Sequence, residues 1–332
     1  MNPSERSQRR VVSRRTAVLG ILSTPALVRG AVAQGAPYPD KPIRMLIGTA
    51  PGASVDLSAR TLATQMERLL KVSVVAENRP GANSSIAAAY VAQSAPDGYT
   101  LQFTAQSIAV NPSLIKVGYD ISTIAAIASV ASIPQTLVVP ADSPVKDVAG
   151  LIAAATKNPN KLNYGSAGIG SPPHLATQIF ERMAKVHFVH IPYKGTAPAM
   201  TDLLAGRLDF MIASLPLTKP YVEAGRLRAL GISSAQRSPL APNIPTISEM
   251  GVTGYESSYW VGLVAPPNTP SDIVTLLDGT VAQASKSPEL EKVFHTAGME
   301  VYYKPHDEFA TMLRDETKRF AALLSGFKKQ DK

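Results

Sequence analysis

The stretch from Ile43 to Asp56 constrains the fold more than any other part of the chain. A short apolar segment, 43–47, leads into a Pro-Gly turn, and apolar residues then recur every three or four positions after Ser54. This predicts a strand, a tight turn and a helix with Ser54 as its N-cap and Asp56 in its first turn. A loop that joins the carboxyl end of a strand to the amino end of a helix presents unpaired backbone N–H groups, so it is suited to bind an anion.

The same pattern returns in the second half of the chain. Residues 162–164 predict a short strand, residues 165–170 a glycine-rich loop, and Ser171 the N-cap of a helix that begins with Pro172 and Pro173. Strand–glycine–helix corners occur throughout α/β proteins, so either loop alone could be structural. Two such loops in matching contexts predict a pair of backbone pockets that close on one small anion from opposite sides.

Length and charge limit the function classes. A chain of 332 residues exceeds one typical domain, which favours two lobes, and a hydrophobic content of 45% is ample for their cores. Residues 1–33 hold six arginines and one glutamate, and therefore +5 of the formal net charge of +8. The remaining +3 is spread without a long basic run, which argues against nucleic-acid binding.

Residues 1–33 have the features of an export signal. An arginine-rich start precedes a short apolar run from Ala17 to Val28, and residues 31–33 fit the small-x-small cleavage pattern. The segment from Ser13 to Leu19 resembles a twin-arginine signal, although ordinary Sec export stays open because Ala17 replaces a bulkier residue. The absence of cysteine removes disulfides and a lipoprotein anchor. We therefore expect a soluble, exported protein, located in the periplasm of a bacterium with two membranes.

Strand-like and helix-like segments alternate along the rest of the chain, which predicts a largely parallel α/β architecture. One strand is expected over 133–139, and the chain is expected to cross into a second lobe near Pro140 and to return through a strand at 259–265. The expected lobes are residues 34–139 with 260–332, and residues 140–259. Two crossings between lobes form a hinge.

Further candidate site residues lie where predicted strands end. Gln106 and Ser107 follow the strand at 100–104, Tyr193 and Gly195 lie in a turn after the strand at 188–191, and Ser214 follows the strand at 208–212. His174 lies three residues into the helix after Ser171, and is either bonded to a neighbouring backbone group or in contact with a ligand. Asp56 is expected to serve as a cap or hinge partner, and the Ser54 hydroxyl is expected to be used in capping.

Signatures of catalysis are weak in this sequence. The sequence contains no Gly-x-Ser-x-Gly motif and no Walker loop, and its five histidines are scattered. The loop at 165–170 is similar to a dinucleotide loop only loosely. We expect no cofactor, no metal and no catalytic residue.

Several motifs, taken together, resemble the tripartite tricarboxylate transporter receptor family, also called Bug receptors. They are Tyr-Pro-Asp-Lys-Pro-Ile-Arg at 38–44, Ala-Pro-Gly at 50–52, Glu-Asn-Arg-Pro-Gly-Ala at 77–82, Ala-Pro-Asp-Gly-Tyr-Thr-Leu at 95–101, Asn-Pro-Ser-Leu at 111–114, Gly-Ser-Ala-Gly-Ile-Gly-Ser at 165–171 with His-Leu-Ala at 174–176, and Pro-Tyr-Lys-Gly at 192–195 with Asp-Leu-Leu at 202–204. They cover essentially the whole chain after the export signal, in order.

The resemblance implies a periplasmic solute receptor with a type II binding-protein fold, in which two α/β lobes close like a flytrap over a ligand cleft. It implies that main-chain amides and bridging waters hold a small carboxylate, with few salt bridges. Carried over residue by residue, it implies Ala50, Pro51, Gly52, Ala53, Ser54 and Asp56 in the first lobe, and Ser166, Ala167, Gly168, Gly170, Ser171 and His174 in the second. Two departures stand out: Ala53 replaces a common glycine, and 83–85 reads Asn-Ser-Ser where the family has a glycine-rich run, which predicts a more polar, bulkier wall.

The expected function is capture of a small carboxylate and its delivery to the membrane subunits of a tripartite transporter, by a monomer. An orphan receptor that serves a signalling partner is the alternative, and an exported enzyme is a weaker one. The sequence does not distinguish citrate, a dicarboxylate, an acidic amino acid and an aromatic carboxylate as ligands.

Overall fold

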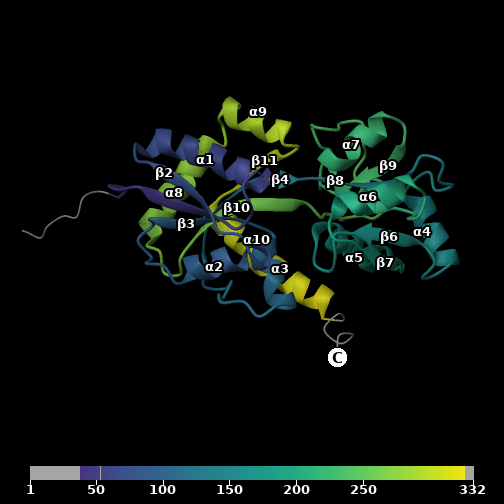
Figure 1. The fold of residues 1–332 in the computed structure, drawn as a ribbon, viewed down its shortest axis with the longest axis horizontal. Helices are drawn as coiled ribbons and strands as arrows, with labels where there is room; N and C mark the ends of the chain where they lie inside the picture. The colour runs from purple at the N-terminus through teal and green to yellow at the C-terminus, as the bar shows by residue number, and fades with distance from the viewer. Residues whose placement is uncertain (1–37, 53, 326–332) are drawn as a thin grey trace, which may run out of the picture. The chain divides into compact units, whose positions relative to one another are not determined.

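The computed structural model describes residues 38–52 and 54–325, with only the backbone of Ser54, so the expected export signal at 1–33 lies outside the described residues. A six-stranded sheet organises the first set of elements (Figure 1). Its strands are β1 (Ile43–Ile47), β2 (Val74–Asn78), β3 (Thr100–Ala105), β4 (Ala125–Ile133), β10 (Tyr259–Ala265) and β11 (Glu300–Lys304). The order is β11-β4-β10-β3-β1-β2, with β1 parallel to β2 and β3 and with β10 antiparallel to β3 and β4.

Among the residues that the structure describes, seven helices belong to this first lobe. They are α1 (Ser54–Leu70), the short 3₁₀ helix η1 (Ala82–Ser84), α2 (Ser85–Ala92), α3 (Ser107–Leu114), α8 (Ser271–Ala284), α9 (Pro288–Thr296) and α10 (His306–Leu324). The periodicity expected for α1 is confirmed, because Val55, Ala59, Leu62 and Met66 are all buried in the core beside the sheet. Burial of this face holds α1, and with it the loop after β1, against the parallel strands.

The second lobe contains two smaller sheets. Their strands are β5 (Gln135–Pro140), β8 (Met211–Ser214) and β9 (Leu227–Ile232), paired antiparallel in the order β8-β5-β9, and β6 (Asn163–Ser166) and β7 (Val189–Pro192), paired parallel. Its helices are α4 (Val148–Lys157), α5 (Pro172–Ala184), α6 (Thr196–Leu204) and α7 (Leu215–Glu223). A parallel bridge between Tyr164 and Phe210 joins β6 to the start of β8.

The two chain crossings run beside each other. Tyr259, at the start of β10, pairs with Ile133, at the end of β4. One residue beyond Pro134, the side-chain amide of Gln135 donates to the carbonyl oxygen of Ser257 at 3.0 Å. The chain therefore passes between the lobes through two adjacent, mutually bonded segments.

Two boundaries of these elements have local causes. The strand expected over 133–139 is divided at Pro134, because proline has no N–H to donate to a neighbouring strand. The chain changes sheet at this residue. The lobe boundary expected after Val139 therefore falls near the end of β5. Helix α4 begins at Val148, because the Asp147 carboxylate caps it by accepting from the Gly150 amide at 2.7 Å. Strands β4 and β11 and helix α3 were not expected.

The centre of the large sheet gives a test of packing. A Cβ on Gly262, in β10, would lie 2.6 Å from the ring of Phe309 and 2.8 Å from the carbonyl oxygen of Ala128. We expect Gly262→Ala to destabilise the fold by about 1–3 kcal/mol in urea denaturation, because helix α10 and strand β4 must both shift. Gly279→Ala is the matched control: no atom lies within 4 Å of its added Cβ, and a helical alanine should stabilise by roughly 0.5–1 kcal/mol. Equal stability of the two variants would contradict this packing.

Candidate functional site

Three corners of the first lobe follow the carboxyl ends of its parallel strands: residues 48–54 after β1, 79–84 after β2, and 106–107 after β3. Because carboxyl ends of parallel strands meet at one edge of a sheet, these corners are neighbours. In the second lobe, residues 167–171 follow β6, residues 193–195 follow β7, and Ser214 ends β8 and is the N-cap of α7.

Asp56 holds the first of these corners. Its buried carboxylate accepts from the Gly52 amide at 2.9 Å, from Arg60 Nε at 3.1 Å and from Asn78 Nδ2 at 2.7 Å. Burial by itself raises the pKa of Asp56, but these hydrogen bonds outweigh it and keep the pKa below its ordinary value. Asn78 also donates to the Thr49 carbonyl at 3.0 Å. Asp56 therefore supports the loop, as expected of a cap or hinge partner.

The second corner is strained. Ala82, Asn83 and Ser84 have φ values of 44°, 50° and 71°, a left-handed conformation that L-residues rarely adopt in succession. Gly48 permits the arrangement, since a Cβ there would lie 2.3 Å from the Ser84 Cβ. Asn83 is paired with Asn111 of α3: Asn83 Nδ2 donates to Asn111 Oδ1 at 2.9 Å, and Asn111 Nδ2 donates to the Asn83 carbonyl at 2.8 Å.

The glycine-rich loop of the second lobe is fixed from within. Ser166 Oγ shares a 2.6 Å hydrogen bond with His190 Nε2 and accepts from the Gly168 amide at 3.0 Å. The Ser171 hydroxyl donates to the Gly168 carbonyl at 2.6 Å instead of capping α5. Because Ser166 is fully buried, its contact with His190, which the sequence did not reveal, supports the loop and does not present a nucleophile.

His174 lies behind this loop. It is fully buried, and its Nδ1 accepts from the Gly170 amide at 3.2 Å, which matches the backbone-bonded alternative for this residue. Burial, together with the nearby His190 ring at 4.5 Å, lowers the pKa of His174 to about 3. The ring is therefore neutral near pH 7 and can accept through Nδ1.

A cavity of about 730 Å³ lies between the two lobes, within the one compact unit that begins at Tyr38. Its lining is Ala82, Asn83, Gln106, Ser107, Val110, Asn111, Leu114 and Ile115 from the first lobe, Ala167, Ile169, Gly170, Ser171, Pro172 and Leu175 from the second, and Tyr259 from the crossing strand. Five of the predicted site residues are among them: Gln106, Ser107, Ala167, Gly170 and Ser171.

The other predicted residues whose side chains the structure describes do not line this cavity. Ala50, Pro51 and Gly52 are exposed, and Ala53 and the Ser54 side chain lie outside the described residues. Tyr193 donates its hydroxyl to Asp202 at 2.8 Å, and Gly195, with φ 118°, precedes α6. Three of the predicted residues support the loops through hydrogen bonds and do not line the cavity: Asp56, Ser166 and His174. Gly168 and Ser214 also lie outside the lining.

Helix α3 supplies three residues that sequence reasoning missed, Val110, Asn111 and Leu114, beside the predicted Ser107. Ser107, Val110, Asn111 and Leu114 line the cavity at the i, i+3, i+4, i+7 spacing of one helical face, a signal present in the sequence. Pro112 obscured it, because proline inside a helix removes a backbone hydrogen bond. In a regular helix the N–H of residue 112 would donate to the Ile108 carbonyl, but Pro112 has no N–H. The Ile108 carbonyl accepts from the Tyr119 hydroxyl at 2.9 Å instead.

The lining contains no charged side chain. In the glycine-rich loop the amides of Gly168, Gly170 and Ser171 are bonded internally, whereas those of Ala167 and Ile169 have no hydrogen-bond partner among the described residues. Pro172 and Pro173 remove two further donors from the start of α5. An anion in this cavity would therefore be held by a few amides and hydroxyls.

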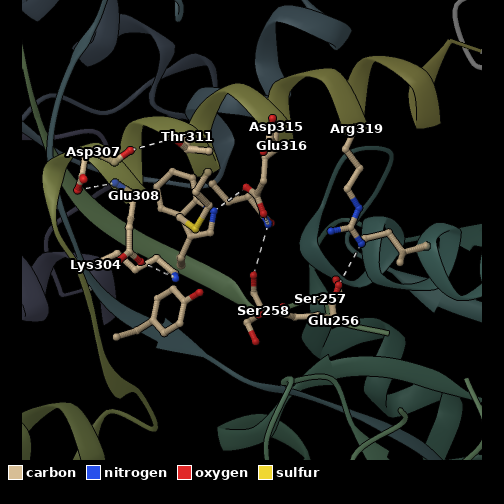
Figure 2. A pocket seen from close by; sticks show the side chains of 15 residues that line it. Glu256, Ser257, Ser258, Lys304, Asp307, Glu308, Thr311, Asp315, Glu316 and Arg319 are labelled. Carbon is tan, nitrogen blue, oxygen red and sulfur yellow. Dashed lines mark hydrogen bonds and ion pairs between the residues drawn. The ribbon is translucent and has the colours of Figure 1, made fainter. Parts of the chain in front are cut away.

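A second cavity, of about 590 Å³, lies between α10, β11 and the crossing segment (Figure 2). Figure 2 shows Glu316 and Arg319 on α10, facing the segment that carries Glu256, Ser257 and Ser258. The Glu316 carboxylate accepts from Trp260 Nε1 at 2.6 Å and from Gln106 Nε2 at 3.3 Å. Gln106 lines both cavities, and its side-chain amide is directed to this second one.

Comparison with known proteins decides the family. The sequence pattern of the tripartite tricarboxylate transporter family receptor matches residues 58–328. The chain belongs to this receptor family. This is a family of binding proteins and not of enzymes. The comparisons confirm the expected α/β periplasmic binding-protein fold and the resemblance to Bug receptors.

Three solved structures illustrate the relationship. The chain is 34% identical to Rpa4515 from R. palustris, solved with adipate, over 87% of this chain and 97% of that one, with a TM-score of 0.69. It is 27% identical to a TctC solute-binding protein from Polaromonas, over 87% of this chain and 99% of that one, with a TM-score of 0.81. It is 32% identical to the periplasmic binding protein BugD, over 87% of this chain and 98% of that one, with a TM-score of 0.66.

Within 38–52 and 54–325, no group of three or more histidine, aspartate or glutamate side chains is placed to hold a metal ion. In the same ranges no helix combines the length and the apolar character needed to cross a bilayer.

Glu316 gives the receptor a predictable pH dependence. Burial raises the pKa of its carboxyl from 4.5 to about 7, against the hydrogen bonds from Trp260 and Gln106 and the charge of Arg319, which lower it. The folded state thus holds this proton more tightly than the unfolded chain, and the resulting stabilisation is lost as pH rises from about 4.5 toward 7. Relative to Glu316→Gln, wild-type stability should fall over this range by up to about 3 kcal/mol, measured by urea denaturation. Asp315→Asn controls for loss of a carboxylate from the same turn, and parallel curves for wild type and Glu316→Gln would refute the assignment.

Proposed function

We propose that this receptor captures a small carboxylate in the cavity between its lobes and delivers it to the membrane subunits of a tripartite tricarboxylate-type transporter. The observation that carries the proposal is the composition of the cavity: loops from the carboxyl edges of two sheets meet there, with hydrogen-bond donors and without a charged side chain. Donors from preorganised loops suit a carboxylate, because amide and hydroxyl groups bond to it without titrating.

Closure of the lobes is part of this proposal. A hydrogen bond to a charged group contributes roughly 1.5–3 kcal/mol, whereas micromolar affinity needs about 8 kcal/mol net of ordering costs. The free amides of Ala167 and Ile169 do not reach that total. We therefore assign the remaining contacts to the first lobe, from Ser107 and Asn83 in the cavity and from the exposed residues 50–52, brought in when the two crossings bend.

The relatives support the carboxylate and the location. Rpa4515 was solved with adipate, and BugD is named a periplasmic binding protein. With the export signal expected at 1–33, this supports a periplasmic receptor, which we propose acts as a monomer. Membrane partners follow from the transporter family to which the chain belongs. An orphan receptor for a signalling partner would bind its ligand in the same way and differ only in that partner.

The test is a thermal-shift screen of ligand-stripped protein with adipate, malate, benzoate and citrate, followed by calorimetry on those that bind. We expect Gly168→Val to abolish binding while circular dichroism stays native. Gly168 has φ 106°, which valine tolerates only at a cost of about 1–3 kcal/mol, so the loop must relax and displace the amides on either side.

Gly251→Val is the matched control. Gly251 has φ 110°, no atom lies within 4 Å of a Cβ at either position, and Gly251 does not line the cavity. Unchanged affinity in Gly168→Val would reject the loop's role, and failure of all four carboxylates to bind would reject the proposed function.

A further inference from the structure

The wall of the inter-lobe cavity is largely apolar, and part of it stays exposed to water. Ile115, directly after α3, is 43% exposed, and Ile169, in the glycine-rich loop of the other lobe, is 47% exposed. Only five large apolar side chains among the described residues are at least 43% exposed, and these two belong to the same cavity. Apolar surface in water is stabilised when another apolar surface covers it.

The apolar wall is firmly supported. Val110 of α3 and Leu175 of α5 join Phe320 and Leu324 of α10 in one hydrophobic cluster, against which Leu114 packs. Gly170 lies directly on Leu114, because a Cβ at Gly170 would be 2.1 Å from Leu114 Cδ1. A ligand therefore meets a fixed apolar floor and not a layer of mobile polar side chains.

Two amide side chains in the wall, those of Asn111 and Gln106, are bonded elsewhere in the protein. Asn111 Nδ2 donates to the Asn83 carbonyl and to Ser85 Oγ, each at 2.8 Å, so both of its amide hydrogens are used. Gln106 Nε2 donates to Glu316 at 3.3 Å and to the Ser258 carbonyl at 3.4 Å, away from this cavity. In the wall expected to be more polar, at 83–85, Asn83 donates to Asn111 and Ser85 accepts from it, so these side chains offer few partners to hydroxyl groups on a ligand.

We infer that the cleft selects a carboxylate whose body is a hydrocarbon chain or ring, over a carboxylate that carries hydroxyl groups along its length. This inference rests on the proposed function, since it names the class of anion bound at that site. The carboxylate lies on loop amides and hydroxyls, and the hydrocarbon body covers Ile115, Ile169, Leu114 and Leu175. A hydroxyl buried against those side chains loses its water without gaining a partner, which weakens binding by about tenfold for each such group.

Adipate and galactarate are the matched probes, because both are six-carbon dicarboxylates and galactarate adds a hydroxyl on each inner carbon. We expect calorimetry on ligand-stripped protein to give an affinity at least tenfold higher for adipate. Benzoate should likewise bind more tightly than malate or citrate. Galactarate equal to or tighter than adipate, or malate or citrate tighter than both adipate and benzoate, would overturn the inference and leave the proposed function standing.

Adipamide separates the two claims. It keeps the hydrocarbon body and replaces both carboxylates with neutral amides. If adipamide binds as tightly as adipate, or if none of the five carboxylates binds, the proposed function itself fails.

Ile169→Ser tests the wall directly, because it removes an apolar side chain and keeps the backbone N–H. We expect about tenfold weaker adipate binding and little change for galactarate. Leu276→Ser, at a residue 38% exposed on α8 and outside the cavity, controls for loss of an exposed apolar side chain and should leave both affinities unchanged. Adipate affinity that is unaffected by Ile169→Ser would overturn the role of the apolar wall.

Discussion

The pairing of the two crossing segments is the constraint on which the rest of the structure depends. Tyr259 pairs with Ile133, and the Gln135 side chain donates to the Ser257 carbonyl, so the outgoing and returning chains are bonded to each other. Each crossing continues directly into a buried strand, β5 on one side and β10 on the other. The loops at the carboxyl edges of both lobes are consequently held near one cavity. A single flexible linker would not bring them together reliably, because ordering a free chain costs conformational entropy.

Three titratable groups beside the cavity loops, Asp56, His174 and His190, support those loops through hydrogen bonds. The Asp56 carboxylate is surrounded by three donors, and His190 bonds to Ser166 at the base of the glycine-rich loop. His174, kept neutral by burial, accepts from the Gly170 amide. Preorganised neutral donors then face the cavity, which lowers the cost of ordering the site on binding. The same arrangement makes the hydrocarbon wall the part of the site that can discriminate between anions.

How far the sequence predicted the fold depended on the pattern in each segment. The strand, loop and helix at 43–70 were predictable, because a short apolar run, a Pro-Gly turn and a regular apolar face all agree there. Strand β4 was not predictable, because its mixture of alanines, serines and isoleucines is typical of more than one kind of secondary structure. Pairing between β10 and β11 makes this segment a strand. Helix α3 was hidden by Pro112, whose missing hydrogen bond is compensated by Tyr119, seven residues further on. Prediction of the site also depended on local patterns. The glycine-rich loop of the second lobe was recognised from its glycines, whereas the cavity-lining face of α3 was not recognised, because Pro112 obscured the helix.

The sequence by itself determined the family, the α/β architecture and the two loops that resemble anion sites, because these depend on local periodicity and on motifs contiguous in the chain. Only the tertiary structure decided which residues share a cavity. It brought Asn83, Ser107 and Leu114 opposite Ala167 and Ile169, and it left Ala50 to Gly52 outside that lining. It also decided which polar groups remain available, since the partners of Asn111 and Gln106 lie 26 or more residues away in the chain. Hydrogen bonds and apolar contacts between distant segments depend on how strands and helices pack, and no local pattern specifies them.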